Sequence, residues 1–225
     1  MLRKEIAEIL ERSREWGWVL EPDALKISSL YGLRTPKHAV AKEPEEAIRL
    51  ARDIGHPVVA KIVSHAVVHK SDVLGVVVGI RDDGELTRTL DRFSRIDGFH
   101  GMLIEEMVQG VELIVGAKND FQFGPMILLG MGGVGVEIYR DVSLRMAPLK
   151  TMDVENMIQD LTAKRVLAGY RGSQPVNIDA LQKTVLAFSG LMMDLKEVAE
   201  SVDLNPVMCN AESCIVADAR IMLKR

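Results

Sequence analysis

The chain has 225 residues, and 48% of them are hydrophobic, so one domain or two small ones can bury a sizeable core. The formal net charge of -4 and the pI near 5.8 argue against a surface for nucleic acid or anionic membranes, because such surfaces need clustered Lys and Arg. Cys209 and Cys214 lack a Cys-x-x-Cys spacing, the first 30 residues lack an apolar signal core, and no apolar run approaches the roughly 18 residues of a membrane span, so we expect a soluble protein in a reducing cytoplasm.

The first half of the sequence predicts three helices before the first long strand. Residues 1–14 carry charges between spaced apolar positions, the second helix starts at Pro22 and stops at Gly32, and the third starts at Pro44 and stops at Gly55. A further helix is predicted at about 83–96. The β-rich runs around it are 58–63, 75–80, 102–108, 111–117 and 125–129.

The second half of the sequence predicts two longer helices and two strands, near 152–168 and 177–193 and at 198–204 and 214–223. Thr151 and Asn177 are the expected N-caps of the helices. Because strands and helices mix without strict βαβ alternation, the sequence predicts an α+β fold in two lobes, joined near residues 101–110.

A glycine-rich run, Gly130-Met131-Gly132-Gly133-Val134-Gly135, matches the Gly-x-Gly-x-x-Gly fingerprint of dinucleotide-binding folds. That fingerprint needs a following helix, because the helix N-terminus holds the pyrophosphate. Residues 142–146 instead alternate apolar and polar side chains, which is typical of a strand, so we set a Rossmann fold aside. The glycines either let the backbone pass close to a ligand or form a tight hairpin.

Lys61 lies inside the apolar run at 58–63, which is typical of a buried strand. Because burying an unpaired ammonium group costs several kcal/mol, Lys61 either meets an anion such as a phosphate or reaches solvent from an edge strand. Glu112 is a similar case at the start of another strand. It could pair with Lys61 or accept a hydrogen bond from a ligand hydroxyl.

Polar side chains follow one face of the last strands. A period of two places Ser201, Asp203 and Asn205 on the same face. If the chain turns back at 210–212 in a hairpin, Asn205 stands opposite Asp218. Three hard oxygen ligands suit Mg²⁺ rather than zinc; the alternative is a solvated sheet face.

The segment Ser64 to Asp72 reads SHAVVHKSD and concentrates titratable side chains. On a helix His65 and His69 would face one way and could chelate zinc, but the strands predicted on both sides argue against a helix. Each histidine could instead be structural, or could accept a phosphoryl group, which a neutral imidazole does near pH 7 without a strong base. The spacing by itself leaves these interpretations open.

Several stretches, in this order, match one family: Tyr31 to Pro36, Val59 to Ser64 with His69 to Asp72, Glu105 to Val108 with Gly110 to Leu113, Asp120 with Phe123 to Pro125, the glycine-rich run through Glu137, Arg145 with Ala147 to Leu149, and Asp203 to Pro206 with Asp218 to Arg220. Together they resemble the β subunits of ADP-forming acyl-CoA (acetyl-CoA) synthetases, which have the ATP-grasp fold and are related to the β subunit of succinyl-CoA synthetase. The resemblance covers about residues 25–222, nearly the whole chain.

The resemblance implies a two-lobed ATP-grasp fold with nucleotide bound between the lobes, and the reaction acyl-CoA + ADP + phosphate ⇌ carboxylic acid + CoA + ATP. A CoA-binding α subunit, in an α2β2 assembly, would pass a phosphoryl group through its own histidine to His69, which would hand it to ADP. The implied division of the chain is an N-terminal helical extension at 1–20 and ATP-grasp subdomains at 21–102 and 103–225.

The same resemblance implies roles for the remaining site residues. Lys61 would contact nucleotide phosphates and Glu112 would lie near the ribose. The residues that would meet adenine, largely through their backbone, are Glu105, Glu106, Met107 and Val108. The residues that would support the phosphates are Lys70, Ser71, Asp72, Gly132 and Gly133, and those that would hold Mg²⁺ are Asp203, Asn205 and Asp218.

Two positions depart from the family pattern. Leu74 stands before Gly75 where the family commonly has a second glycine, so the loop after His69 would move less freely. Ser201 replaces an acid often found two positions before Asp203.

Two other functions stay open: a stand-alone ATP-grasp carboxylate ligase that works through an acyl phosphate, and a non-catalytic subunit that binds adenine nucleotides.

Overall fold

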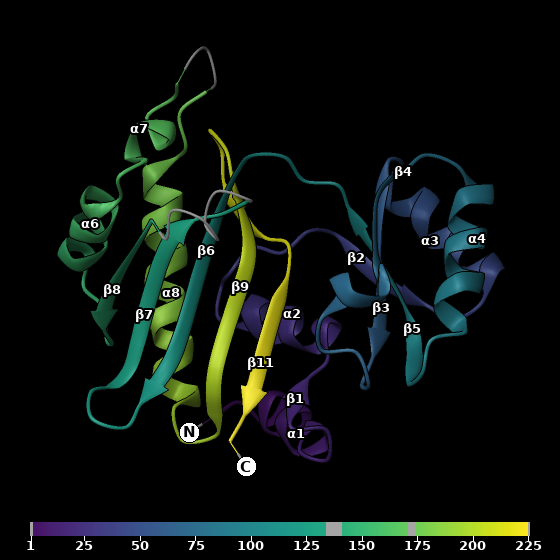
Figure 1. Ribbon diagram of the computed structural model, residues 1–225, viewed down its shortest axis with the longest axis horizontal. Coiled ribbons are helices and arrows are strands. Elements are labelled where there is room, and N and C mark those ends of the chain that lie inside the picture. Colours follow the sequence, from purple (N-terminus) through teal and green to yellow (C-terminus); the bar gives the residue numbers. More distant parts are fainter. Residues whose placement is uncertain (1, 134–140, 171–173, 225) are drawn as a thin grey trace. The chain divides into compact units, whose positions relative to one another are not determined.

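The computed structural model describes residues 2–133, 141–170 and 174–224. The chain forms two compact units: a smaller one, Pro36–Val108, and a larger one made of Met1–Thr35 and Gln109–Arg225 (Figure 1). These bounds differ from the expected divisions after residues 20 and 102. The helix at 21–30 packs on the last strand of the larger unit, and residues 103–106 belong to a strand inside the smaller one.

The smaller unit, all of whose residues are described, has a four-stranded antiparallel sheet in the order β2-β5-β3-β4. Its elements are β2 (His38–Ala41), α3 (Pro44–Ile54), β3 (Val58–Ser64), the 3₁₀ turn η1 (Lys70–Val73), β4 (Val76–Ile80), α4 (Asp83–Ser94) and β5 (Phe99–Glu106). As predicted, α3 begins at Pro44 and ends before Gly55, which has a φ of 103°. Asp82 caps α4, because its side chain accepts a hydrogen bond from the Glu85 N–H at 2.8 Å.

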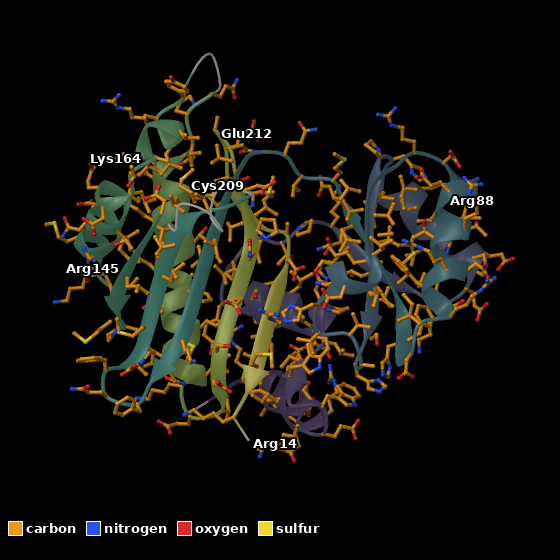
Figure 2. The ribbon with its side chains drawn as sticks, in the orientation of Figure 1. Arg14, Arg88, Arg145, Lys164, Cys209 and Glu212 are labelled. Atoms are coloured by element: carbon orange, nitrogen blue, oxygen red, sulfur yellow. A yellow bond between two sulfur atoms is a disulfide. The ribbon has the colours of Figure 1, made fainter. Side chains whose placement is uncertain are left out.

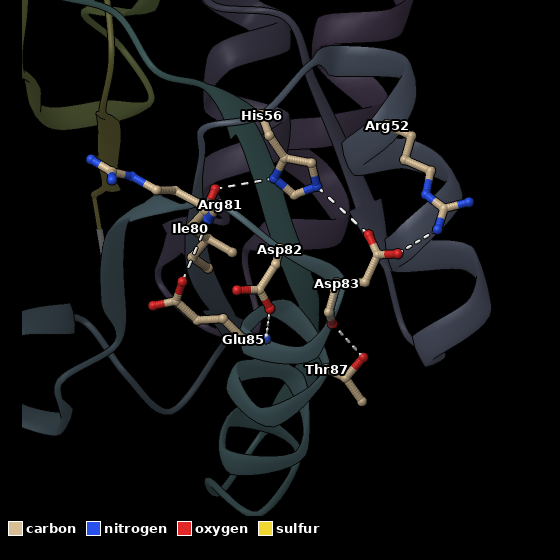
Figure 3. A network of polar contacts seen from close by, with 8 residues as sticks. All are labelled: Arg52, His56, Ile80, Arg81, Asp82, Asp83, Glu85 and Thr87. Atoms are coloured by element: carbon tan, nitrogen blue, oxygen red, sulfur yellow. Dashed lines mark hydrogen bonds and ion pairs between the residues drawn. The ribbon is translucent and has the colours of Figure 1, made fainter.

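A polar network joins the ends of α3, β4 and α4 (Figure 3). The imidazole of His56 places Nδ1 3.1 Å from the Ile80 carbonyl oxygen and Nε2 3.7 Å from Asp83 Oδ1. The other carboxylate oxygen of Asp83 pairs with the guanidinium of Arg52. These contacts tie the two helices of the smaller unit to each other at one end.

The period of two along β3 and β5 gives the small sheet two different faces. The helix-covered face is apolar, and its core comprises Ala41, Ala47, Ala51, Val58, Ala60, Ile62, Ile80, Leu86, Leu90, Phe93, Met102 and Ile104. Lys61 lies between Ala60 and Ile62 in β3, and Glu105 follows Ile104 in β5. Because side chains alternate along each strand, Lys61 and Glu105 therefore lie on the face opposite the apolar core.

Within the described residues, the larger unit holds a seven-stranded antiparallel sheet in the order β1-β11-β9-β6-β7-β8, with β10 paired to β9. Its elements are α1 (Lys4–Ser13), β1 (Trp18–Val19), α2 (Glu21–Leu30), β6 (Val111–Asp120), β7 (Gly124–Met131), β8 (Val142–Met146), α6 (Thr151–Asp160), α7 (Lys164–Leu167), α8 (Ile178–Leu195), β9 (Ala199–Cys209), β10 (Cys214–Val216) and β11 (Ala219–Leu223). As predicted, Asn177 caps α8 and its side chain accepts from Ala180 N at 2.9 Å. Helix α8 packs against β6, β7 and β9 (Figure 1).

The hairpin that carries the polar stripe has the predicted register. Cys214 pairs with Cys209 at its closed end, and farther along the Asn205 N–H donates to the Asp218 carbonyl at 3.2 Å. Asn205 and Asp218 therefore stand opposite each other, as the sequence predicts.

Pro206 lies inside β9 at a bulge. Asn205 and Pro206 together stand opposite the single residue Ile114 of β6, where the register shifts. Proline has no N–H to give to a ladder, and a bulge tolerates it within a sheet. The pairing of β9 therefore continues past Pro206 to Cys209.

The helix predicted at 152–168 is two helices, α6 and α7. The cause is Asp141, which is distant in sequence: its carboxylate accepts from the N–H groups of Thr162 at 2.7 Å and Ala163 at 2.8 Å. These bonds satisfy N–H groups at the start of α7 and so favour a break there. The N-cap of α6 is Lys150 rather than Thr151. The short elements β1, β2 and η1 were not predicted.

Cys209 and Cys214 form a disulfide with a Cα–Cα distance of 4.1 Å at the end of the hairpin (Figure 2). Their spacing gave no sign of this bond, because they meet only when the chain turns back between them. The expectation of a reducing compartment rested partly on that spacing, and the disulfide removes this part of its support. None of the helices in the described residues is long and apolar enough to cross a membrane.

Candidate functional site

Lys61 and Glu105 form a buried ion pair in the smaller unit. The distance from Nζ to Oε2 is 2.6 Å, and the side chains are 7% and 3% exposed. Lys61 pairs with Leu103 in the ladder, so Glu105 is its diagonal neighbour on the same face. Because β3 lies between β5 and β4, the edge-strand interpretation of Lys61 was wrong.

The end of β5 leads into the segment expected to meet adenine. The Glu106 N–H donates to the Lys37 carbonyl at 2.8 Å, and the Lys37 N–H lies 3.2 Å from Glu106 Oε2. Met107 and Val108 follow the strand and are half-buried. The Glu106 N–H is used in the contact with Lys37 and is not open to adenine; the backbone contact of the segment from Glu105 to Val108 with adenine stays a prediction.

His69 is exposed on the loop between β3 and β4, directly before η1. Both ends of this loop are fixed. At the first end Ser64 Oγ donates to the Asp97 carbonyl at 2.7 Å, and at the second the Gly75 N–H donates to the Lys70 carbonyl at 2.7 Å. The imidazole of His69 is thus exposed, where a partner can reach it, on a loop whose two ends are hydrogen-bonded.

The two histidines of this segment do not share a helix, so zinc chelation by a helical pair is excluded. His65 instead places Nδ1 2.9 Å from Nε2 of His100 in β5. The three residues expected to support phosphates beside His69 all lie in η1: Lys70, Ser71 and Asp72.

Leu74 ends η1 in the left-handed region, with a φ of 51° and a ψ of 38°. This conformation costs a non-glycine residue roughly 1–2 kcal/mol, because Cβ crowds the following carbonyl. The side chain is 71% exposed, so little packing offsets the cost. A glycine would adopt the backbone conformation of Leu74 without this cost.

Two predicted residues of the glycine-rich run lie against Glu112 in the larger unit. The Gly132 N–H donates to the Glu112 carbonyl at 2.6 Å, and a Cβ on Gly132 would lie only 2.7 Å from the Glu112 carbonyl carbon. A Cβ on Gly133 would lie 3.2 Å from Glu112 Oε2. The run therefore allows a close backbone approach beside this carboxylate; residues 134–137 lie outside the described residues.

The polar stripe of β9 and β11 is also in the larger unit. Asn205 is exposed and stands opposite the half-buried Asp218, and Asp203 lies two residues along the same face. Asp203 packs across Gly116 of β6 and pairs with Arg220, whose Nη2 is 3.1 Å from Oδ2. Sequence reasoning missed Arg220, although the predicted hairpin register places it opposite Asp203.

The donor set of this stripe fits Mg²⁺. Carboxylate and amide oxygens are the ligands that hard cations prefer, and Asp203, Asn205 and Asp218 offer these groups on one sheet face. No group of three His, Cys, Asp or Glu suited to a metal occurs in the described parts of the chain, so an amide ligand is needed to complete the set. The carboxylate of Asp203 is also paired with Arg220, so a bound Mg²⁺ and the guanidinium would share its negative charge.

Arg145, from another stretch that matches the family, is held at the edge of the large sheet. Its Nη2 lies 2.7 Å from Asp160 Oδ2, and Ser143 Oγ donates to the same oxygen at 2.9 Å. These hydrogen bonds, first that of Arg145 and then that of Ser143, hold the pKa of Asp160 below its usual value.

Residues 10–223 match the ATP-grasp domain family. The chain is 40% identical to the β subunit of acetate–CoA ligase [ADP-forming] I from Pyrococcus furiosus, over 96% of this chain and 97% of that subunit. It is also 40% identical to acetate–CoA ligase [ADP-forming] I from Archaeoglobus fulgidus, over 98% of this chain but only 33% of that protein.

A solved structure of a dinucleotide-forming acetyl-coenzyme A synthetase from Ca. Korarchaeum cryptofilum superposes with a TM-score of 0.85 and 38% identity, and covers 97% of this chain and 100% of that one. That protein is in complex with coenzyme A and Mg-AMPPCP, and its phosphohistidine segment points towards the nucleotide binding site. The chain therefore belongs to the ATP-grasp family and, within it, to the β subunits of ADP-forming acetate–CoA ligases.

Proposed function

We propose that this chain binds ADP and ATP and that His69 carries a phosphoryl group between a partner α subunit and the nucleotide, in the reaction acyl-CoA + ADP + phosphate ⇌ carboxylic acid + CoA + ATP. The observation that carries the proposal is the exposed His69 on a loop with both ends fixed. A transfer of this kind needs an accessible nucleophile with a defined position.

The phosphoryl group would move in two steps, first to His69 and then to ADP, and neither step needs an oxidant or a reductant. A neutral nitrogen of His69 attacks the phosphorus of a phosphohistidine on the α subunit, and one P–N bond forms as another breaks. A β-phosphate oxygen of ADP then attacks the same phosphorus, the new P–N bond breaks, and ATP leaves with the phosphoryl group. Lys70, next to His69, offers positive charge close to the phosphoryl group.

Nucleotide binding would use residues from several places along the chain. Lys61 would face the nucleotide phosphates with its ammonium held by Glu105, and the backbone of the segment from Glu105 to Val108 would meet adenine. Glu112 offers a carboxylate to the ribose hydroxyls, beside Gly132 and Gly133, where the backbone can approach a ligand. Phosphoryl transfer depends mainly on such positioning and on neutralised charge.

Asp203, Asn205 and Asp218 would hold Mg²⁺, and Arg220 would keep the Asp203 carboxylate in place. Bound there, Mg²⁺ would neutralise charge on the nucleotide phosphates. The chain's own contribution would be the hairpin of β9, β10 and β11, which would present the three oxygen ligands on one face.

The partner would be a CoA-binding α subunit in an α2β2 assembly in the cytoplasm. The matched Archaeoglobus fulgidus protein is about three times as long as the stretch that this chain covers, which supports a need for further domains. Coenzyme A and the acyl group would be held mainly by that partner.

The test uses the purified chain and [γ-³²P]ATP with Mg²⁺, followed by mapping of the acid-labile label. Label on a peptide that contains His69, and its loss in His69→Asn, is expected. His38→Gln is the matched control, because His38 lies on β2 of the same unit. Absence of label, or label on another residue, would contradict the proposal. Full turnover by His69→Asn together with the α subunit would favour a carboxylate ligase instead.

A further inference from the structure

His65 and His100 form an imidazole pair that the proposed reaction does not use. His65 follows β3 and is exposed, and His100 lies in β5 and is half-buried. Nδ1 of His65 is 2.9 Å from Nε2 of His100, and the rings lie edge to face with 5.1 Å between their centroids and 67° between their planes. Two ring nitrogens that can both act as metal ligands thus face each other at hydrogen-bonding distance.

The arrangement is close to that of two imidazoles on one tetrahedral cation. With metal–nitrogen distances of about 2.0–2.1 Å, the two nitrogens would lie about 3.3 Å apart and the ring centroids about 5.2 Å apart. The observed centroid separation of 5.1 Å already agrees with this value. The nitrogens need to separate by only about 0.4 Å from the 2.9 Å of the pair, which a ring rotation on the exposed His65 can supply.

The chemistry of the pair selects a class of cation. Imidazole nitrogen suits borderline divalent ions such as Zn²⁺, whereas Mg²⁺ prefers oxygen ligands. The His65–His100 pair and the stripe of Asp203, Asn205 and Asp218 therefore suit different ions. With two protein ligands, water would complete the coordination of the ion, as in an open and exchangeable site.

We propose that His65 and His100 form a binding site for Zn²⁺ or a similar borderline divalent cation. The site lies at the base of the loop that carries His69. Ser64, next to His65, already joins this base to the turn before β5 through its hydrogen bond to the Asp97 carbonyl, and a cation shared by His65 and His100 adds a second link. Binding would fix the first end of the loop more tightly to β5.

The experiment is a calorimetric titration of the full-length chain, with its disulfide intact, using ZnCl₂. We expect a site whose Kd rises at least about tenfold in His65→Gln and in His100→Gln, because each change removes one of two ligands. His38→Gln, which removes another histidine of the same unit, should leave the titration unchanged. Circular dichroism without metal checks that each variant is folded.

A second measurement needs no variant. In ¹⁵N-labelled wild-type protein, Zn²⁺ should shift the ring nitrogens of His65 and His100 together, and EDTA should reverse the shift. The proposal is overturned if these signals do not move, if the double variant His65→Gln/His100→Gln binds Zn²⁺ as the wild type does, or if His38→Gln loses binding equally.

Discussion

Lys61 Nζ lies 2.6 Å from Glu105 Oε2 across two neighbouring strands, and both side chains are almost fully buried. The pair explains how an apolar strand accommodates a lysine: the charge is neutralised by a diagonal neighbour on the same face. A buried ion pair gains little net free energy, but the loss of one partner leaves an uncompensated charge.

Glu105→Ala should therefore lower the free energy of unfolding by about 3–5 kcal/mol, measured by urea denaturation. The double change Lys61→Met/Glu105→Leu should recover most of this loss, because it removes both charges and keeps the volume. Glu106→Ala is the control, since Glu106 is the next residue but only half-buried. Equal losses for Glu105→Ala and Glu106→Ala would contradict the importance of the buried pair.

Leu74 holds a left-handed backbone conformation with an exposed side chain. Asn tolerates this conformation and Ile does not. Leu74→Asn should slow hydrogen exchange at the Gly75 amide, which closes the turn on Lys70, and Leu74→Ile should speed it. Identical exchange in the two variants would show that the left-handed backbone carries no strain.

The hydrogen bond from Arg145 lowers the pKa of Asp160, and this direction determines how Asp160 makes the stability of the fold depend on pH. The ionised carboxylate is favoured in the folded state, and its contribution to stability is present above the unfolded pKa of about 3.9 and lost as pH falls through the lowered folded value. In a carboxyl ¹³C NMR titration, Arg145→Gln should raise the pKa of Asp160. Lys164→Gln should raise it less, since the charge of Lys164 makes a smaller contribution.

Tyr31 is held in its neutral form. Burial, followed by its hydrogen bond to Asp194 at 2.8 Å, raises the pKa of its phenol. The stability from the neutral phenol is present below the unfolded pKa of about 10 and is lost as pH rises through the raised folded value. Tyr31→Phe should leave the absorbance change at about 295 nm between about pH 9 and 11 unaltered. A smaller absorbance change in Tyr31→Phe than in the wild type would contradict the raised pKa of Tyr31.

Local patterns in the sequence predict much of this fold. Pro44 and Gly55 bound α3 because their backbones suit the first turn and the end of a helix. The hairpin register follows from the position of the turn, so the opposition of Asn205 and Asp218 could be predicted without tertiary information. The family resemblance, carried by an ordered set of short motifs, is confirmed by the match to the ATP-grasp family.

The parts that could not be predicted depend on contacts between distant residues. Glu105 meets Lys61 only because β5 pairs with β3, and His100 reaches His65 for the same reason. Asp141 interrupts a helix predicted about twenty residues later, through hydrogen bonds that no local rule contains. The roles of His69 and of the metal-binding residues stay predictions that the labelling experiment addresses.

The disulfide sits at the closed end of the hairpin that carries the oxygen ligands. In a β-hairpin, a slip of one residue turns every side chain of a strand to the other face. Cys209 and Cys214 are directly opposite each other, so their covalent bond permits only one alignment of the strands. The disulfide therefore maintains the register in which Asp203 and Asn205 share a face with Asp218. It does so from several residues away, even if the hydrogen bonds between the two strands open briefly.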